Sequence, residues 1–465
     1  MKLFFYTILT LVVFQSCTPK IIQTNNGLRS FKKPINKLLN DSNLDVSIGI
    51  KMVALNTGIT LYEFNSNKLF TPASNNKLFT LGAALHYLGS EYIFKTNVYT
   101  FNENLILKGS GDPDLSINQL DSLAYQTSKL IDSVDTLFLD ANDLDSIYFG
   151  DGWMWNEGSW WYAAQVGALS LNDNCIDFII NPGKLGDPIK VLTYPKTDYI
   201  SISNNSKTVE KDQNVKKLSI NRDWINKTNH FTISGSLPEN SSPDTLKRNI
   251  EDPTLYTGTI FKEFLNRYGI EVKHISKTSI KKQSQLIASH KSKSLIHSAK
   301  NLMNESDNLS AELFLKKIGS SNFKQGSWNN GLEKMKIFLH DSAKIDSTNF
   351  RMVDGSGLSR YNLFSASELT TFLEWVYSSQ YKNDFISCLP TGGMKNGTME
   401  NRLPHLGEML RVKTGGLSGV TNISGYIFSN SYGPIAFSIL TNGYTGDSAP
   451  YRVIQDKIIK YMLHD

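Results

Sequence analysis

The chain has 465 residues, of which 40% are hydrophobic and 20% charged, and its formal net charge is +5 at pH 7. This length excludes one ordinary domain and predicts a globular protein of two or three well-cored domains. The positive charge is spread along the chain without a long basic run. This argues against a nucleic-acid partner and is compatible with an anionic polymer as substrate.

The N-terminus is typical of an exported protein. An apolar run over residues 3–14 is too short to span a bilayer and fits the core of a signal peptide. A small residue directly before Cys17 resembles a bacterial lipobox, so we predict a lipoprotein-type signal over residues 1–17 with Cys17 as the lipid attachment site. Gln15 and Phe14 depart from the strict pattern, which leaves a plain secretory signal as the alternative. Either way we expect the protein in the bacterial cell envelope, in the periplasm. In the lipoprotein case the lipid at Cys17 would anchor it to a membrane.

Cysteine and histidine are too sparse to indicate a disulfide framework or a metal centre. Beyond Cys17 only Cys175 and Cys388 occur, far apart, and two buried free thiols are the simpler prediction. The histidines show no metal-ligand spacing, and no Gly-rich phosphate loop follows a strand. We therefore expect neither a cofactor nor a metal.

The first part of the chain predicts a strand hairpin followed by a helix. A linker and a short helix around residues 31–39 precede alternating strands over 46–52 and 59–64. Behind Ser74, leucines recur at helical spacing at positions 78, 81, 85 and 88. Gly82 within this run costs a little helix propensity without breaking the pattern.

From about residue 97 the pattern changes to short strands and turns, which we assign to an inserted domain over residues 97–187 and 251–280. Residues 188–250 are rich in Ser, Thr, Asn and Lys and predict a small β domain nested within it. An amphipathic helix is expected over 253–268.

Helical patterns return from Leu295, and the end of the chain predicts two paired strands and a closing helix over 451–463. The simplest topology makes one catalytic domain from residues 18–96 and 281–465. It would be an α/β (α+β) domain with a central antiparallel sheet, a terminal helix on one face and an all-helical lobe. The two inserted, nested domains would be mainly β.

Three short motifs carry the chemistry, and the first is Ser74-Asn75-Asn76-Lys77. A lysine three residues after a serine on one helical face can reach the serine oxygen and act as its base when neutral. Ser-x-x-Lys also begins at residues 30, 279, 321 and 379, and taken alone it would be a helix-cap serine with a surface lysine. Only Ser74 begins a long apolar helix after a hairpin.

The second and third motifs are Ser306-Asp307-Asn308 and Lys413-Thr414-Gly415. The serine can relay a proton to a leaving amine, and Asn308 can hold a substrate amide. Lys413 and Thr414 suit a substrate carboxylate, and the N–H groups of Gly416 and Ser74 suit an oxyanion. Each motif alone would be an ordinary polar turn or a solvated edge strand. No G-x-S-x-G elbow occurs, which argues against an α/β-hydrolase.

The three motifs in this order resemble those of penicillin-binding proteins and serine β-lactamases. Gly109-Ser110-Gly111-Asp112-Pro113, residues 168–174 and residues 354–360 (Asp-Gly-Ser-Gly-Leu-Ser-Arg) narrow the resemblance. It points to the D-alanyl-D-alanine carboxypeptidase/endopeptidase family of the penicillin-binding protein 4 type, low-molecular-mass class C. The resemblance covers residue 45 to the C-terminus, and the long insert after the first motif is typical of that family.

The resemblance implies roles for the matching residues. Ser74 would attack the penultimate D-Ala of a peptidoglycan stem peptide, and Lys77 would take its proton. Ser306 would pass a proton to the departing amine and Asn308 would position the substrate. The third motif, Lys413-Thr414, would hold the terminal carboxylate. β-Lactams would acylate the nucleophile and be released slowly. The family often has Ser or Thr where this chain has Gly416, a change that keeps a backbone oxyanion donor but loses a side-chain contact.

A tryptophan cluster surrounds Glu157 early in the insert. The resemblance implies that this carboxylate contacts the free amine of a diaminopimelate side chain, which is chemically sensible. Alternatively, the cluster is a hydrophobic seam between domains with Glu157 on its rim. Residues 354–360 are expected to form a structural loop near the cleft.

Two other functions compete with a DD-carboxypeptidase that is also an endopeptidase. A serine β-lactamase or esterase on the same scaffold would need a positioned base for fast deacylation, and no motif supplies one. A non-catalytic β-lactam sensor or wall-binding module is disfavoured because the catalytic set is complete.

Overall fold

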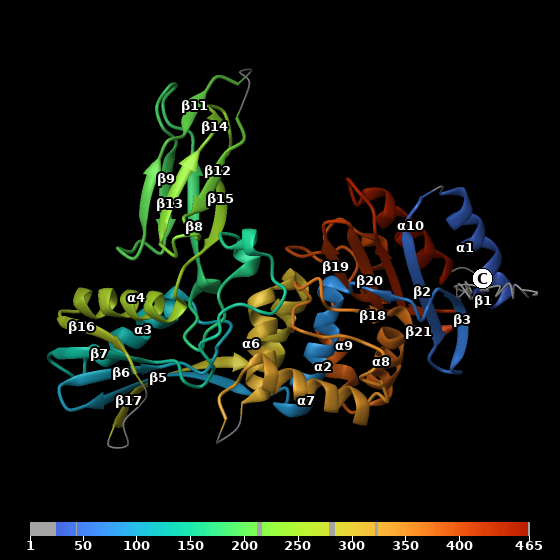
Figure 1. Ribbon diagram of the computed structural model, residues 1–465, viewed down its shortest axis with the longest axis horizontal. Coiled ribbons are helices and arrows are strands. Elements are labelled where there is room, and N and C mark those ends of the chain that lie inside the picture. The colour runs from blue at the N-terminus through green and yellow to red at the C-terminus, as the bar shows by residue number, and fades with distance from the viewer. Residues whose placement is uncertain (1–24, 43, 212–215, 279–283, 321–323, 464–465) are drawn as a thin grey trace, which may run out of the picture.

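The computed structural model describes residues 25–42, 44–211, 216–278, 284–320 and 324–463. Figure 1 shows an elongated molecule in which both ends of the chain build one end, a second sheet builds the other, and a narrow β tower stands upright on the second sheet. Across these described ranges, no helix is both long and apolar enough to cross a membrane. The predicted lipid site at Cys17 lies outside them.

Both ends of the chain meet in a six-stranded antiparallel sheet, which we call the terminal sheet. Its strand order is β1 (Asn25–Gly27), β3 (Ile59–Phe64), β2 (Ser47–Ala54), β21 (Gly433–Asn442), β20 (Val420–Ser429) and β19 (Leu410–Leu417). Strands β2 and β21 pair along their full length, which joins the blue and red ribbons of Figure 1. The expected domain built from both chain ends therefore has a physical basis in this pairing.

Helices cover both faces of the terminal sheet. Helices α1 (Arg29–Asp41) and α10 (Ala449–Tyr461) pack on one face, and α8 (Ala366–Ser378) packs on the other. Strand β20 is consequently buried along almost its entire length, as expected for a strand with both faces covered. Strand β19 is the last strand in this order, so the Lys413 motif lies on an edge strand of the terminal sheet.

The helical lobe surrounds α2 (Lys77–Tyr87), in which every residue from Lys77 to Leu85 is buried. Helix α2 packs against α6 (Asn308–Gly319), α7 (Trp328–Asp341) and α9 (Lys382–Cys388), and α5 (Leu295–Asn301) packs against α9. Gly82 has a packing role, because a Cβ there would lie 2.5 Å from the Phe372 ring of α8. The small loss of helix propensity at Gly82 is thus offset by close approach of two helices.

The inserted sheet has the order β16 (Val272–Lys277), β7 (Val134–Asp140), β6 (Asn104–Lys108), β5 (Ile93–Phe101) and β17 (Gln285–Ser294). Helices α3 (Ile117–Ser128) and α4 (Pro253–Arg267) share its apolar core and pack on each other. Strand β17 follows residue 280, where the sequence predicted a return to the catalytic domain, yet it pairs with β5. Alternation along a strand predicts the strand but not its partner.

The β tower (residues 175–249) stands on this domain (Figure 1). One of its sheets has the order β15 (Asp244–Asn249), β8 (Cys175–Asn181) and β9 (Lys190–Tyr194). The other has the order β10 (Ser201–Asn204), β13 (His230–Ser234) and β12 (Ser219–Arg222), and two short strands, β11 (Lys207–Val209) and β14 (Ser236–Pro238), form a separate pair. Phe178 and Phe231 join the sheets, with ring centroids 4.9 Å apart. Strand β8 begins before residue 188, the predicted start of the nested domain, whose limits stay a prediction.

Cys175 and Cys388 are both buried and free. The prediction of two unpaired thiols is confirmed for the residues that the structure describes. A last short ladder pairs β4 (Leu69–Phe70) with β18 (Phe364–Ser365). Strand β4 lies just before the turn that carries Ser74.

Candidate active site

Ser74 lies in a single 3₁₀ turn, Ala73–Asn76, which runs directly into α2. Ala73 has a left-handed backbone (φ 47°), a strained conformation for a residue with a side chain. The turn packs tightly on Gly357, where a Cβ would lie 1.9 Å from the carbonyl oxygen of Ala73. Glycine at 357, itself at φ 83°, is therefore needed to hold the serine at the cleft.

The amine of Lys77 meets three oxygen atoms. Its Nζ lies 3.0 Å from Ser74 Oγ, 2.6 Å from Asn308 Oδ1 and 2.8 Å from the carbonyl oxygen of Ser356. The side chain is fully buried, and burial lowers the pKa of Lys77 from 10.5 to about 8. The carboxylates of Asp307, Glu312 and Asp354 oppose this shift. A lysine with this pKa is partly neutral near pH 8 and can accept the proton of the serine.

A buried carboxylate, Glu312 of α6, shapes the loop behind Lys77. It accepts hydrogen bonds from the backbone N–H groups of Gly355 and Ser356, both at 2.8 Å, and from the Trp328 indole at 2.8 Å. These bonds aim the Ser356 carbonyl at the lysine. Burial first, and the neighbouring Asp354 carboxylate second, raise the pKa of Glu312 to about 7.

Asp354 holds the other side of the same loop. Its carboxylate accepts from the N–H groups of Gly357 (2.8 Å) and Ser359 (2.6 Å) and from the indole of Trp153 (3.1 Å). Residues 354–360 were predicted to be a structural loop near the cleft. The loop is in direct contact with the site, because the Ser356 carbonyl oxygen accepts one of the three hydrogen bonds of Lys77.

The second motif joins two helices, as expected, through a π-helical turn (Leu302–Ser306). Asp307 then caps α6 by accepting from the N–H groups of Leu309 and Ser310. The π-helical turn ends before Asp307 and α6 begins after it. The side chains on either side of the cap, Ser306 and Asn308, line the cleft. Asn308 bridges the two parts of the molecule, since its Nδ2 donates to the Tyr162 carbonyl oxygen at 2.8 Å.

The third motif lines the cleft from edge strand β19. The fully buried Lys413 donates from Nζ to Ser306 Oγ at 2.9 Å and to the Thr414 carbonyl at 2.8 Å. Burial, and then the charge of Lys77, lower the pKa of Lys413 well below its usual value. The charge of Lys77 thus acts on Lys413 across the cleft.

The two glycines of this strand, Gly415 and Gly416, have different structural roles. A Cβ on Gly415 would lie 2.7 Å from the Pro72 carbonyl oxygen, so Gly415 lets the strand pack under the serine turn. A Cβ on Gly416 would meet nothing closer than 3.9 Å. Gly416 therefore leaves open space in the cleft, where a substrate backbone can approach the strand.

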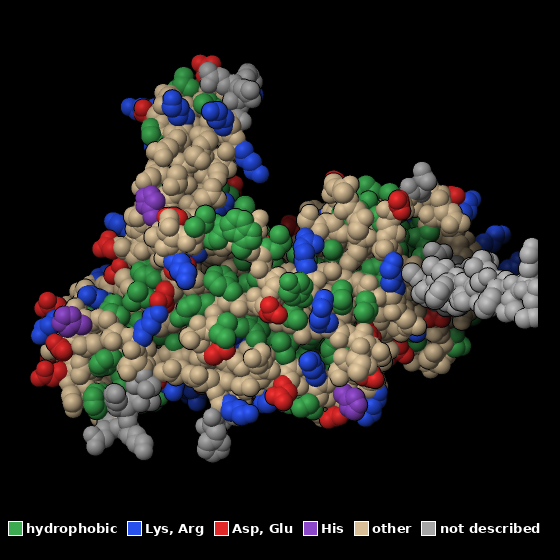
Figure 2. Space-filling view, viewed as in Figure 1, with side chains coloured by type: hydrophobic (Ala, Val, Ile, Leu, Met, Phe, Trp, Pro, Cys, Tyr) green, Lys and Arg blue, Asp and Glu red, His purple; other side chains and the backbone are tan. Residues whose placement is uncertain are grey.

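All three motifs open into one cavity of about 880 Å³, which we call the catalytic cavity. Its lining includes Ser74, Ser306, Asn308, Thr414 and Gly416 from the predicted set. Glu157, Trp160, Trp161 and Tyr162 from the inserted domain form the facing wall. Figure 2 shows the molecule hollowed between the β tower and the end that carries the terminal sheet.

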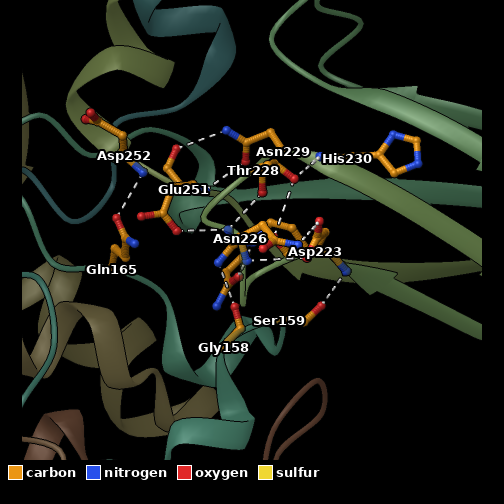
Figure 3. A network of polar contacts seen from close by, with 12 residues as sticks. Gly158, Ser159, Gln165, Asp223, Asn226, Thr228, Asn229, His230, Glu251 and Asp252 are labelled. Atoms are coloured by element: carbon orange, nitrogen blue, oxygen red, sulfur yellow. Dashed lines mark hydrogen bonds and ion pairs between the residues drawn. The ribbon is translucent and has the colours of Figure 1, made fainter.

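The facing wall is anchored by Arg222 at the base of the β tower. This buried guanidinium donates to the Gly158 carbonyl (2.7 Å) and to Glu251 (2.9 Å), and the Arg222 N–H donates to Ser159 Oγ (2.9 Å). Figure 3 shows this network, in which Asn229 also accepts from the Glu251 N–H. The tower therefore fixes the backbone on which the wall residues stand.

A sequence model of the D-Ala-D-Ala carboxypeptidase 3 (S13) family matches residues 31–462. The chain belongs to this family. Its similarity to the D-alanyl-D-alanine carboxypeptidase of Actinomadura sp. is 30% identity over 460 residues, covering 93% of this chain and 84% of that relative. D-Alanyl-D-alanine carboxypeptidase DacB of Haemophilus influenzae is 27% identical over 429 residues, covering 86% of each chain.

The fold of this carboxypeptidase family member agrees with the sequence relatives. The crystal structure of penicillin-binding protein 4 from Haemophilus influenzae matches with a TM-score of 0.80 at 25% identity, covering 92% of this chain and 98% of that one. The predicted family, fold class and enzyme class are confirmed by these matches.

All the predicted catalytic and substrate-binding residues lie within the part of the chain that the structure describes, and they come together at one site. Ser74, Lys77 and Asn308 form one hydrogen-bonded group, and Ser306 with Lys413 forms a second. Thr414, Gly416 and Glu157 line the same cavity. The role of each in catalysis stays a prediction.

The sequence did not reveal the groups that hold the site through backbone atoms, or those that come from segments distant in sequence from the three motifs. The carbonyls of Ser356 and Tyr162 hold Lys77 and Asn308 in place, and any residue type supplies a carbonyl. Glu312 was missed because a glutamate in a helical pattern normally faces water. Its place on the buried face of α6, four residues after Asn308, was the available signal.

Proposed function

We propose that this protein is a serine D-Ala-D-Ala carboxypeptidase that cleaves peptidoglycan stem peptides through an acyl-enzyme on Ser74. The observation that carries the proposal is the buried amine of Lys77, 3.0 Å from Ser74 Oγ and with its pKa lowered to about 8. A serine is a weak nucleophile until a neighbouring base takes its proton. In the described part of the cleft, Lys77 has both the position and the pKa for this task.

The reaction would run in two steps. In acylation, Ser74 Oγ bonds to the carbonyl carbon of the penultimate D-Ala while Lys77 takes the hydroxyl proton. The C–N bond then breaks, and Ser306, which accepts a hydrogen bond from Lys413, passes a proton to the departing amine. The proton that Lys77 took from Ser74 replaces the one that Ser306 gives up. In deacylation, water attacks the ester, a carboxylate product forms and the Ser74 hydroxyl is restored.

Substrate would lie along the edge of β19. The N–H groups of Ser74 and Gly416 would donate to the oxyanion, and Asn308 to the substrate amide. The presence of all three residues in the lining of the catalytic cavity supports this proposal. Thr414 and Lys413 would hold the terminal carboxylate. A β-lactam would occupy the same place, a proposal supported by the β-lactam complex of the Haemophilus influenzae penicillin-binding protein 4.

Mass spectrometry tests the proposal directly. Incubation with benzylpenicillin is expected to add one penicilloyl group to the intact protein, on the peptide that contains Ser74. Incubation with a stem pentapeptide is expected to release one D-alanine. Fast penicillin turnover without peptide cleavage would instead favour a β-lactamase, and absence of any adduct would contradict the acyl-enzyme.

We further propose that Glu157 recognises the side-chain amine of the third stem residue. Glu157 lines the catalytic cavity on the wall facing Ser74, and burial raises the pKa of this carboxyl. A half-buried carboxylate gains more from an ammonium partner than an exposed one does. Met154 and Trp160 line the same cavity, which gives the amine an apolar and aromatic rim beside the Glu157 carboxylate.

Replacing Glu157 by glutamine is expected to lower kcat/KM for diaminopimelate peptides about 10- to 100-fold, the loss of one charged hydrogen bond. Acylation by benzylpenicillin, which has no such amine, is expected to change little. A pentapeptide with its side-chain amine acetylated is the matched substrate control and should be cleaved equally by both proteins. Equal loss with penicillin and peptide would show that Glu157 has only a structural role.

We also propose that the protein works in the bacterial cell envelope. A cell-wall substrate and the relatives reported above support this location, and the lipobox-like sequence before Cys17 supports a lipid anchor there.

A further inference from the structure

Two fully buried carboxylates, Glu312 of α6 and Asp354 of the loop 354–360, lie behind Lys77. Both oxygens of each carboxylate accept hydrogen bonds from N–H groups. For Glu312 the donors are the backbone of Gly355 and Ser356 and the indole of Trp328; for Asp354 they are the backbone of Gly357 and Ser359, the amide of Asn362 and the indole of Trp153. Since an N–H cannot accept a proton, this arrangement favours the ionised form of both carboxylates.

Three consecutive peptide groups of the loop connect the two carboxylates to the segment that carries Ser74 and Lys77. Their carbonyl oxygens, on Asp354, Gly355 and Ser356, accept from the side chains of Asn76 (2.8 Å), Thr80 (2.6 Å) and Lys77 (2.8 Å). Their N–H groups donate at 2.8 Å, the first two to Glu312 and the third to Asp354. Each peptide group therefore has a carboxylate at its N–H end and a donor from the turn before α2, or from α2 itself, at its carbonyl end.

This orientation matches the dipole of a peptide group, which is positive at the N–H and negative at the carbonyl. A carboxylate at one end and an ammonium at the other both stabilise it. The carbonyl oxygen that contacts Lys77 belongs to the peptide group whose N–H donates to Asp354. One peptide group thus separates the amine from a negative charge, and Glu312 holds the two peptide groups before it.

The charges around the amine act in opposite directions. Burial lowers the pKa of Lys77, whereas the carboxylates of Asp307, Glu312 and Asp354 raise it. Two further buried lysines belong to the same group of charges: Lys413, which interacts with Lys77, and Lys316, which shares α6 with Glu312. An amine buried without counter-charges would be neutral but too weak a base, because a general base works best with a pKa near the working pH.

We propose that Glu312 and Asp354 are positioning residues for the general base. Ionised together, they hold three peptide groups against the segment that carries Ser74 and keep the amine of Lys77 a strong enough base to take the serine proton. The inference rests on the proposed function. Neither carboxylate lines the catalytic cavity, so both act on the reaction through Lys77 rather than on the substrate.

The test removes one charge at a time without changing the size of the side chain, in Glu312→Gln and Asp354→Asn. The rate of acylation by benzylpenicillin is measured from pH 5 to pH 9. In the wild type it should rise as Lys77 loses its proton, with a midpoint near pH 8. In each variant the midpoint is expected at least about half a pH unit lower, because a charge that raises the pKa of Lys77 is gone. The plateau should fall about tenfold or more, because the base is weaker and less well held.

Two further variants separate charge from packing. Glu312→Asp keeps the charge but is one methylene shorter, so we expect the wild-type midpoint with a lower plateau. Glu368→Gln is the matched control, because Glu368 is a half-buried carboxylate that accepts from the Ser365 N–H at 2.7 Å and lies outside the catalytic cavity. This control should keep both the midpoint and the plateau of the wild type.

A thermal melt shows which variants are folded. An unchanged midpoint in folded Glu312→Gln or Asp354→Asn, whatever the plateau, would overturn the proposal by leaving the carboxylate a purely structural role. A midpoint displaced to higher pH would overturn it as well. If neither of these variants folds, Glu312→Asp decides, since a wild-type plateau there would contradict positioning by Glu312. Failure of the wild type to form a penicilloyl adduct would instead refute the proposed function itself.

Discussion

Ser74→Ala is expected to abolish labelling by penicillin and to lower kcat for D-alanine release about a thousandfold or more. The side chain has one described hydrogen-bond partner, Lys77, so the substitution removes the nucleophile while the turn stays packed by Ala73 and Gly357. Stability should change little because Ser74 is only half-buried. Fluorescent penicillin on a gel, pentapeptide turnover and a thermal melt measure the three effects.

The chain offers a matched control with the same motif. Ser379 and Lys382 repeat the Ser-x-x-Lys spacing, but Ser379 follows the end of α8 and its hydroxyl donates to the Val376 carbonyl oxygen at 2.8 Å. Ser379→Ala should therefore label and hydrolyse like the wild type. Labelling that survives in Ser74→Ala would show that another nucleophile carries the acyl group.

The sequence predicted the elements that depend on local pattern. Leucine spacing behind Ser74 gave a buried helix, and alternation near the C-terminus gave the β20–β21 pair. These predictions succeed because burial of one helix stripe or strand face leaves a periodic trace in the residues themselves. The three motifs were informative for a different reason. A nucleophile, a proton relay and a carboxylate site must all be present for one cleft to carry out the reaction, so finding the three together predicted the function.

Contacts between distant segments left no such trace. The loop Gly355–Ser356 lies against Glu312 through backbone N–H groups, and Asn308 is held by the Tyr162 carbonyl. The sequence also could not show that β17 pairs with β5, because strand propensity carries no record of the partner. The cavity of about 1040 Å³ that residues of the tower and of the helical lobe line together likewise depends on how these two parts face each other.

Lys77→Met is expected to lower the rate of acylation about 10²- to 10⁴-fold, the usual contribution of a general base. Methionine fills most of the same buried space but cannot accept a proton. The pH dependence gives a sharper readout than the loss alone. With the pKa of Lys77 near 8, only the minor neutral fraction is active below that pH, and each unit of acidification lowers this fraction about tenfold.

The rate of penicillin acylation by the wild type should accordingly rise from pH 6 and level off above about pH 8, whereas Lys77→Met should show a low, flat profile across that limb. Lys316→Met is the control, because Lys316 is a second fully buried lysine, paired with Asp145 at 2.7 Å and outside the cavity lining. It should cost stability but keep the rising limb. A wild-type rate that is constant from pH 6 to pH 9, or a Lys77→Met profile that still rises, would assign the base to another group. Lys413 is then the next candidate, since burial and the charge of Lys77 lower its pKa well below its usual value.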